Sequence, residues 1–261
     1  MGVRNENAIG LDFAGHSTLL LELDGQKIVT DPLFRTNLLH LRRQAPPVDV
    51  PRYTQVDAVL ISHSHLDHLD KRSLKLIPRD VRAIVPSDVV SIFKGLGFKS
   101  VTGLSAGGST ELGELSVIAT DALHKGSRMP WNQEAESLGF VIRGSQSAYF
   151  AGDTDLFDEM AELTGIDLAL LPVWGWGPKL GPGHLDPARA AEAAAMIAPR
   201  VAVPIHWGGY MPAPLARRRP ELLVDPPRDF IRMTNELAPA VDARLVEPGD
   251  STTIDPVGEG V

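Results

Sequence analysis

The sequence predicts an α/β (α+β) fold, a four-layer αββα sandwich of two similar halves with two sheets face to face and helices outside. Three observations predict it: strand-like hairpins open each half, strand–helix units follow in both halves, and apolar residues suffice for a core. The 261 residues are 43% hydrophobic and 22% charged, as in an ordinary globular protein. No linker or low-complexity segment interrupts the chain, so residues 1–261 are expected to form a single domain.

The first half opens with segments whose apolar residues alternate as in half-buried strands. The dipeptide Asp24-Gly25 predicts a hairpin turn between two of them. The stretch from Leu33 to Gln55 contains prolines and arginines and is predicted to be a long loop, which in a compact domain is usually functional or disordered. The strands predicted here are Ala8–Phe13, Ser17–Leu23 and Lys27–Thr30.

Strands and helices alternate through the rest of the first half. The apolar run Val56–Ile61 predicts a buried strand, and a short helix follows with Asp70 as its cap. Val81–Val85 predicts the next strand, and Ser87–Leu96 predicts a helix capped by its first residue.

The second half repeats this order. Its paired strands are predicted at Ser109–Leu112, Leu115–Asp121, Ser137–Arg143 and Ser147–Ala151. Its strand–helix part is predicted to contain a helix near Leu156–Leu163, strand Asp167–Leu171, a helix from Pro187 to Ala198 capped by Asp186, strand Val201–Ile205, a helix near Arg228–Leu237 and strands near Ala243–Val246.

The strongest chemical signal is the hexapeptide HSHLDH at residues 63–68, which follows the predicted strand Val56–Ile61 directly. His63 and His65 would face the same way if the strand continues into them, and Asp67 and His68 would turn toward a second metal. Imidazole and carboxylate bind zinc well and also suit manganese or iron. The alternative is a solvated polar turn, which is disfavoured because three of the chain's eight histidines lie in this hexapeptide.

Three further candidate ligands, His124, Asp153 and His206, each end a predicted apolar strand. A single histidine at a strand end more often has a structural role, and an aspartate in Gly-Asp-Thr-Asp more often caps a turn or helix. The position that all three share with the hexapeptide favours metal binding.

The composition narrows the classes of protein. The formal net charge of -8 disfavours a uniformly basic nucleic-acid binder, so no nucleic-acid partner is expected. The chain has no cysteine, which excludes disulfides, thiolate zinc sites and cysteine nucleophiles. MGVRNENAIG at the start lacks the apolar run of a secretory signal, and no run is long enough for a membrane span. A cytoplasmic location is therefore expected.

The hexapeptide, followed by separate His, Asp and His positions in this order, resembles the metallo-β-lactamase superfamily. The resemblance implies that His63, His65 and His124 hold a first metal, that Asp67, His68 and His206 hold a second, and that Asp153 bridges both. It implies two divalent ions, zinc in the first place with manganese or iron as alternatives, and a hydrolase whose bridging hydroxide is oriented by Asp67. The absence of a cysteine ligand separates the chain from the branch that hydrolyses β-lactams.

Four shorter motifs resemble the branch of ascorbate-6-phosphate lactonases and N-acyl-phosphatidylethanolamine phospholipase D-type enzymes. They are GHST at 15–18, DPLF at 31–34, GHLDP at 183–187 and IHWG at 205–208. The branch implies a small-molecule or lipid-like anionic substrate, either a phosphodiester or a phosphorylated lactone.

Two histidines outside the ligand set are expected to act on substrate. His184 lies just before the predicted helix start at Asp186, where free N–H groups attract anions, so it is a candidate general acid or anion ligand. His16 is a candidate pocket residue, and local hydrogen bonding is the alternative for both. His40 has no such context and is expected to be an ordinary loop residue.

Aromatic and basic residues near the site loops are further candidates. Tryptophans suit an apolar pocket wall, with ordinary packing as the alternative: Trp174 and Trp176, together with Trp131 and Trp207. Arginines suit an anionic head group, although a solvated surface is their commoner role: Arg35, Arg42, Arg43, Arg217, Arg218 and Arg219.

Two other functions are compatible with the same ligands. A redox-active iron would make the chain a non-hydrolytic, dioxygenase-like enzyme, which iron content and oxygen uptake would identify. A metal-stabilised protein would bind ligands without catalysis, and a cleft giving access to both metals would argue against it.

Overall fold

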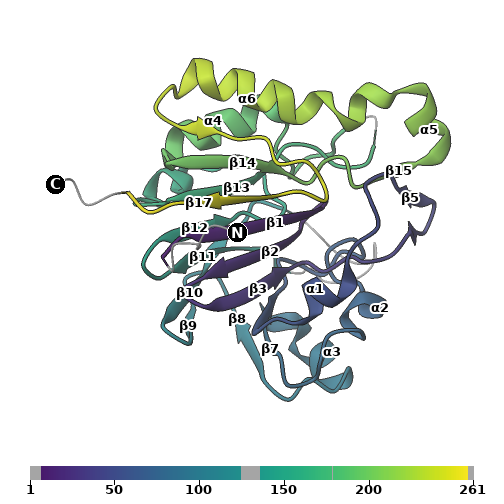
Figure 1. Cartoon of the computed structure of the whole chain (residues 1–261), viewed down its shortest axis with the longest axis vertical. Helices are drawn as coiled ribbons and strands as arrows, with labels where there is room; N and C mark the ends of the chain where they lie inside the picture. The colour runs from purple at the N-terminus through teal and green to yellow at the C-terminus, as the bar shows by residue number, and fades with distance from the viewer. Residues whose placement is uncertain (1–6, 125–135, 178, 258–261) are drawn as a thin grey trace, which may run out of the picture.

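The computed structural model describes residues 7–124, 136–177 and 179–257, and its two large sheets pack face to face with helices outside (Figure 1). The first sheet contains, in spatial order, β17 (Ser251–Ile254), β1 (Ile9–Gly15), β2 (Thr18–Leu23), β3 (Gln26–Thr30), β6 (Ala58–Leu60), β7 (Arg82–Pro86) and β8 (Val101–Leu104). The second contains β16 (Asp242–Ala243), β14 (Val201–Ile205), β13 (Leu168–Pro172), β12 (Ser147–Phe150), β11 (Leu138–Arg143), β10 (Leu115–Asp121) and β9 (Ser109–Leu112).

The two sheets are built alike, which confirms the αββα prediction with two similar halves. In the first sheet β1, β2 and β3 pair antiparallel, and β3, β6, β7 and β8 then pair parallel. In the second sheet β9 to β12 pair antiparallel, and β12, β13, β14 and β16 pair parallel. Parallel strands require crossovers, so the helices of each half lie on the outer face of its sheet.

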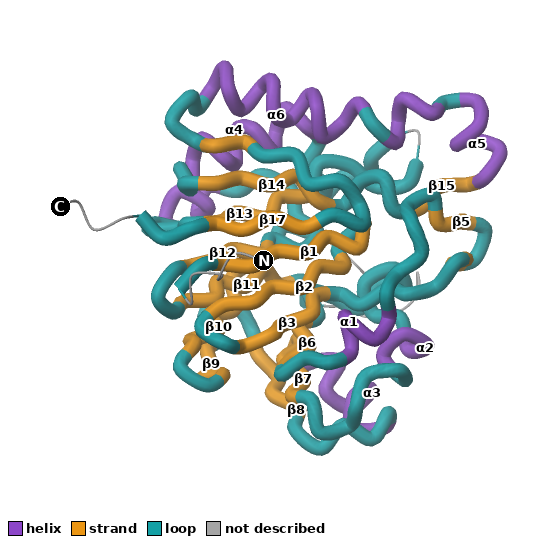
Figure 2. The backbone as a smooth tube through the Cα atoms, viewed as in Figure 1, coloured by secondary structure: helices purple, strands orange, loops and turns teal. Residues whose placement is uncertain are grey.

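Helices cover each sheet on one side only (Figure 2). Beside the first sheet are α1 (Val50–Thr54), α2 (Lys71–Leu74) and α3 (Val90–Gly95), the last preceded by the 3₁₀ turn η1 (Ser87–Val89). The second half contributes η2 (Asp158–Glu162), α4 (Pro187–Ile197), α5 (Ala213–Arg218), η3 (Pro220–Leu223) and α6 (Asp225–Leu237). Within the described ranges, no helix is long and apolar enough to cross a membrane.

The central strands of the first sheet are buried on both faces. Ile28 and Leu60 belong to the cluster between the sheets, whereas their neighbours Val29 and Val59 belong to the cluster under α1, α2 and α3. Because successive side chains of a strand point to opposite faces, both positions must be apolar. This explains the near-continuous apolar runs of these strands.

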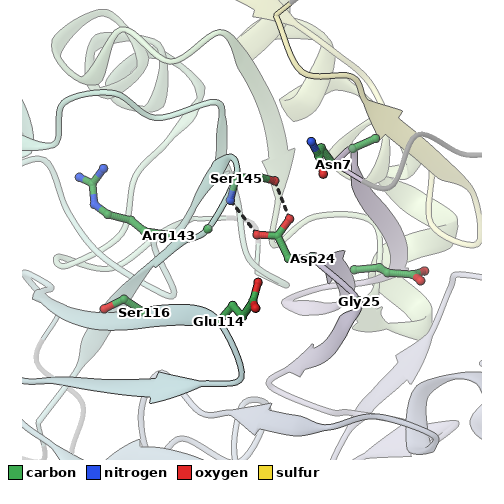
Figure 3. A pocket seen from close by; sticks show the side chains of 10 residues that line it. Asn7, Asp24, Gly25, Glu114, Ser116, Arg143 and Ser145 are labelled. Carbon is green, nitrogen blue, oxygen red and sulfur yellow. Dashed lines mark hydrogen bonds between the residues drawn. The ribbon is translucent and has the colours of Figure 1, made fainter.

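The predicted Asp24-Gly25 turn is confirmed, and it ties the two halves together. Both residues have left-handed backbone angles, with φ of 47° and 74°, as a tight hairpin turn requires. The Asp24 carboxylate accepts hydrogen bonds from the backbone N–H (2.7 Å) and the hydroxyl (2.5 Å) of Ser145, in the turn between β11 and β12 (Figure 3). The hollow beside these turns, of about 830 Å³, contains no candidate ligand in its lining.

The prediction of one long loop from Leu33 to Gln55 is wrong. The segment contains β4 (Asn37–Leu38), β5 (Leu41–Arg43) and α1. These two strands form a hairpin that pairs with β15 (Tyr210–Pro212), from the far end of the sequence. Strands of two and three residues are too short to show an alternation of apolar and polar residues, and the strand that pairs with them is distant in the sequence. The local sequence therefore does not reveal them.

Two predicted helices and one cap also differ. Ser87 makes no capping hydrogen bond, because it begins a 3₁₀ turn and α3 starts only at Val90. The helix predicted near Leu156–Leu163 is the 3₁₀ turn η2. The caps Asp70 and Asp186 are confirmed, since each carboxylate accepts the backbone N–H three residues later at 3.0 Å.

Candidate metal centre

Histidines and aspartates from both halves meet where strands of the two sheets end. They follow β1, β3, β6, β10, β12 and β14 in turn: His16, Asp31, His63, His124, Asp153 and His206. The fold therefore brings the separate sequence candidates to the hexapeptide, at the junction of the halves.

The first group of ring nitrogens belongs to His63, His65 and His124. Nε2 of His63 lies 2.9 Å from Nδ1 of His65, and Nε2 of His124 lies 3.2 Å from the same atom. Around a tetrahedral zinc ion, with bonds of about 2.0–2.1 Å, ligand atoms would be about 3.3 Å apart. The spacing of this group suits a single divalent ion.

The second group contains Asp67, His68 and His206, with His16 beside them. Nε2 of His68 lies 3.2 Å from Nε2 of His206 and 3.9 Å from Oδ2 of Asp67. His16 reaches the group through Asp67, because its Nε2 lies 3.0 Å from Oδ2 of that carboxylate.

Asp153 lies between the two groups. Its Oδ2 is 3.2 Å from Nε2 of His68 and 3.7 Å from Nε2 of His184, and its Oδ1 is 3.1 Å from Nε2 of His206. It can also share an ion with His63 and His68. Asp153 therefore lies within reach of ligand atoms from both groups.

In three of the candidate ligands, His68, His124 and His206, the ring nitrogen Nδ1 donates a hydrogen bond to an oxygen atom, which fixes the orientation of the ring. Nδ1 of His206 donates to the Trp174 carbonyl at 2.5 Å, and Nδ1 of His124 donates to the Gly183 carbonyl at 2.7 Å. Nδ1 of His68 donates to the Asp31 carboxylate at 2.7 Å. Nδ1 therefore carries a proton in each ring, and Nε2 faces the centre, as in metal-binding histidines.

Nε2 of His68 and Nε2 of His206 lie 3.2 Å apart, and two lone pairs at this distance repel unless a cation or a proton lies between them. Oδ1 of Asp153 is buried and accepts no hydrogen bond among the described residues, although Nε2 of His206 is near. A buried carboxylate oxygen needs a partner, and a divalent ion supplies one. The residues present therefore fit the implied metals.

The protonation states of the candidate ligands also fit metal binding. Burial lowers the pKa of His65 to about 4 and that of His206 to about 3, so both imidazoles are neutral near pH 7. Burial alone would raise the pKa of Asp153, but His206 and His68 hold it well below its usual range. Neutral imidazole and ionised carboxylate are the forms that bind metal.

His68 is the exception, because three carboxylates act on it. Burial disfavours its charged form, but Asp153, Asp67 and Asp31 together raise the pKa of His68 well above its ordinary value. This negative charge would also favour a bound cation.

A cavity of about 410 Å³ opens onto this centre. Its polar lining includes His65, Asp67, Asp153, His184 and His206. Its apolar lining consists of Leu38, Leu39, Leu41, Leu66, Trp176 and Leu180. Leu39 is 74% exposed and Trp176 is 37% exposed, so the mouth presents apolar surface to solvent.

The tryptophans have different positions. Trp176 lines the cavity, whereas the Trp174 side chain lies in a separate hollow beside Asp186 and only its carbonyl reaches the centre. Trp207 is buried, with its ring 6.0 Å from that of Phe13. Trp131 lies outside the described residues.

None of the candidate arginines lines the cavity. Arg35 pairs with Asp70 at 3.3 Å, and Arg43 donates to the backbone carbonyls of Pro46 and Ala14. Arg42, Arg217, Arg218 and Arg219 are exposed.

Sequence reasoning missed two residues. Asp31 was present only as part of the DPLF motif, yet it is fully buried and accepts hydrogen bonds from His68 and from Ser62. His40 lines the cavity with its ring 5.6 Å from that of Trp176, because the β4–β5 hairpin places it there. An aspartate directly after a strand was the available signal for Asp31, whereas no local signal marked His40.

Comparison with known proteins agrees with this geometry. Residues 26–207 match the family model described as a beta-lactamase superfamily domain. The chain is 31% identical over 248 residues to a metal-dependent hydrolase from Caldivirga maquilingensis, covering 92% of this chain and 96% of that protein. It is 29% identical over 233 residues to N-acyl-phosphatidylethanolamine-hydrolyzing phospholipase D 1 from Caenorhabditis elegans, covering 79% of this chain and 65% of that protein.

The fold agrees as well. Igni18, a metallo hydrolase from Ignicoccus hospitalis, superposes with a TM-score of 0.73 at 24% identity, covering 96% of this chain and all of that one (100%). The chain belongs to the metallo-β-lactamase superfamily and is a metal-dependent hydrolase.

Asp31 provides a test of how the ligands are held. In Asp31→Asn the carboxylate that holds Nδ1 of His68 loses its charge, so we expect metal affinity to fall about 10–100-fold. Competition with a chromophoric chelator measures this. Asp57→Asn is the matched control, because the Asp57 carboxylate accepts the backbone N–H of Lys27 at 2.8 Å, outside the centre. Equal affinities for the two variants would contradict this role.

Proposed function

We propose that this hydrolase has a binuclear centre, zinc in the first place, and cleaves an anionic ester of a small or lipid-like molecule. The observation that carries the proposal is the pair of ligand groups joined by Asp153 at the floor of an apolar-walled cavity. His63, His65 and His124 would hold one ion, and Asp67, His68 and His206 the other. Since the chain has no cysteine, we also propose a cytoplasmic location.

Two divalent ions there would lower the pKa of a water molecule and neutralise charge that develops on the substrate. The chain's own residues then position the reactants. Asp67 is 17% exposed at the cavity, where its carboxylate can accept a hydrogen bond from the attacking water and orient it. No side-chain nucleophile is needed.

His184 suits proton donation to the leaving group. Its side chain is 26% exposed at the cavity wall, and its Nε2 faces Asp153 at 3.7 Å. Nδ1 lies 3.2 Å from the Gly181 carbonyl, which fixes the ring. A proton on Nε2 would therefore be directed into the cavity, next to the place where an ester bond would break.

The apolar walls favour a lipid-like phosphodiester over a phosphorylated lactone. Leu39, Leu66 and Trp176 can bury hydrocarbon, whereas a sugar lactone would leave them in contact with polar groups. Lys179, also in the wall, could pair with a phosphate. The C. elegans relative, named for hydrolysis of a phospholipid, supports this choice.

The direct test is hydrolysis of bis(p-nitrophenyl) phosphate by zinc-loaded protein. We expect turnover in the native chain and at least about a 100-fold loss in Asp153→Ala, because the bridging carboxylate is removed. Asp158→Asn, an exposed aspartate of η2, is the control and should retain activity. No turnover despite bound metal would overturn the phosphodiester proposal. Iron with oxygen uptake would favour the dioxygenase-like alternative.

A second test separates the role of His184 from general damage. General acids matter most when the leaving group is a poor one. His184→Ala should slow hydrolysis of an alkyl phosphodiester about 100-fold or more but leave p-nitrophenolate release nearly unchanged. Kinetics on the paired substrates measures this, and equal losses on both would exclude proton donation.

A further inference from the structure

We infer that His16 is a positioning residue that holds the Asp67 carboxylate in its working orientation. It does not touch substrate and it does not bind metal. The inference rests on the proposed function for its kinetic readout, and a spectroscopic readout is independent of it.

His16 reaches the site only through Asp67. It is 1% exposed and does not line the cavity, whereas Asp67 does. Nε2 of His16 lies 3.0 Å from Oδ2 of Asp67. A carboxylate only accepts hydrogen bonds, so the inferred positioning contact requires the proton on Nε2 of His16.

That proton distinguishes positioning from ligation. His16 lies within ligand distance of Asp67, His68 and His206, which would also suit a fourth ligand of the second ion. A nitrogen that donates its proton to a carboxylate has no lone pair to offer a metal. Held in this way, the Asp67 carboxylate cannot rotate freely about its side-chain bond.

The backbone at His16 is strained in a way that serves this contact. Its φ is 62°, in the left-handed region that residues with a side chain rarely adopt, and Gly15 before it has φ of 108°. Its carbonyl accepts the N–H of His206 at 2.8 Å, and His206 also has φ of 62°. The same turn thus presents the imidazole to one candidate ligand and the carbonyl to another.

Packing fixes the ring as well. Its centroid lies 4.0 Å from that of His206, and Tyr210 contacts it edge-on at 6.0 Å. A Cβ on Gly209 would come within 2.9 Å of the backbone nitrogen of His16 and 3.0 Å of its Cβ. These contacts therefore restrict the position of His16, and any side chain at position 209 would displace it.

The test compares His16→Ala with His16→Gln at saturating metal. In His16→Ala we expect two ions per chain, kcat lower by about 10–100-fold and KM within about two-fold. In His16→Gln the amide N–H can replace Nε2–H and should restore most of kcat. A fall to one ion per chain would mean that His16 is a ligand. Equal losses in both variants, or a loss in KM alone, would mean that it is not a positioning residue.

Gly209→Ala tests the same contact without changing His16. We expect a loss of kcat in the native background and little further loss when combined with His16→Ala, because both act through one imidazole. Gly95→Ala, at a helical glycine with open space around it, is the control and should have no effect. Fully additive losses would contradict the inference.

The absorption spectrum of the cobalt(II)-loaded protein provides a readout that needs no substrate. If the native chain turns over no phosphodiester, the proposed function fails but the spectrum still reports on Asp67. We expect His16→Ala to shift the cobalt bands at unchanged cobalt content, and Gly95→Ala to leave them unchanged. An unshifted spectrum in His16→Ala would overturn the inference.

Discussion

The structure depends on compensating three carboxylates that all act on His68: the buried Asp31 and Asp153 and the part-buried Asp67. Burying unpaired charge is costly, and buried charges in proteins are paired or coordinate metals. A single proton on His68 cannot balance three carboxylates, and burial lowers the pKa of the neighbouring imidazoles of His63, His65, His124 and His206. The proposed pair of divalent ions would offset this negative charge, and the charge of the centre is the reason to propose that the ions bind there.

The two-sheet architecture makes that convergence possible. Each half ends its strands at the same edge, so ligands that are far apart in sequence arrive together without any long reach by a side chain. Rigid strand ends hold ligands more precisely than free loops do. Acceptors around the centre then fix the rings: Trp174 and Gly183 supply carbonyls to His206 and His124, and Asp31 supplies a carboxylate to His68. Left-handed backbone at Asp31 and His206 shows that local strain is tolerated where it positions these groups.

The sequence was sufficient for most features with a local signal, although the cap predicted at Ser87 and the helix predicted near Leu156–Leu163 were wrong. The density of histidines in HSHLDH marked the centre, and strand-ending His124, Asp153 and His206 completed it. The caps Asp70 and Asp186 were readable for the same reason, since a cap bonds only three residues ahead. What could not be read depends on pairing between distant segments. The β4–β5 hairpin exists because β15 pairs with it, and that pairing places His40 in the cavity. His16 looked like a pocket residue, but the fold buries it behind Asp67.

The number of metal ions per chain tests the central claim most directly. After dialysis against excess Zn²⁺ and removal of free metal, elemental analysis should give two ions for the native chain. It should give one for His63→Ala, which removes a ligand of the first group, and one for His206→Ala, which removes a ligand of the second. One ion in the native chain, or two in both variants, would contradict a binuclear centre at these residues.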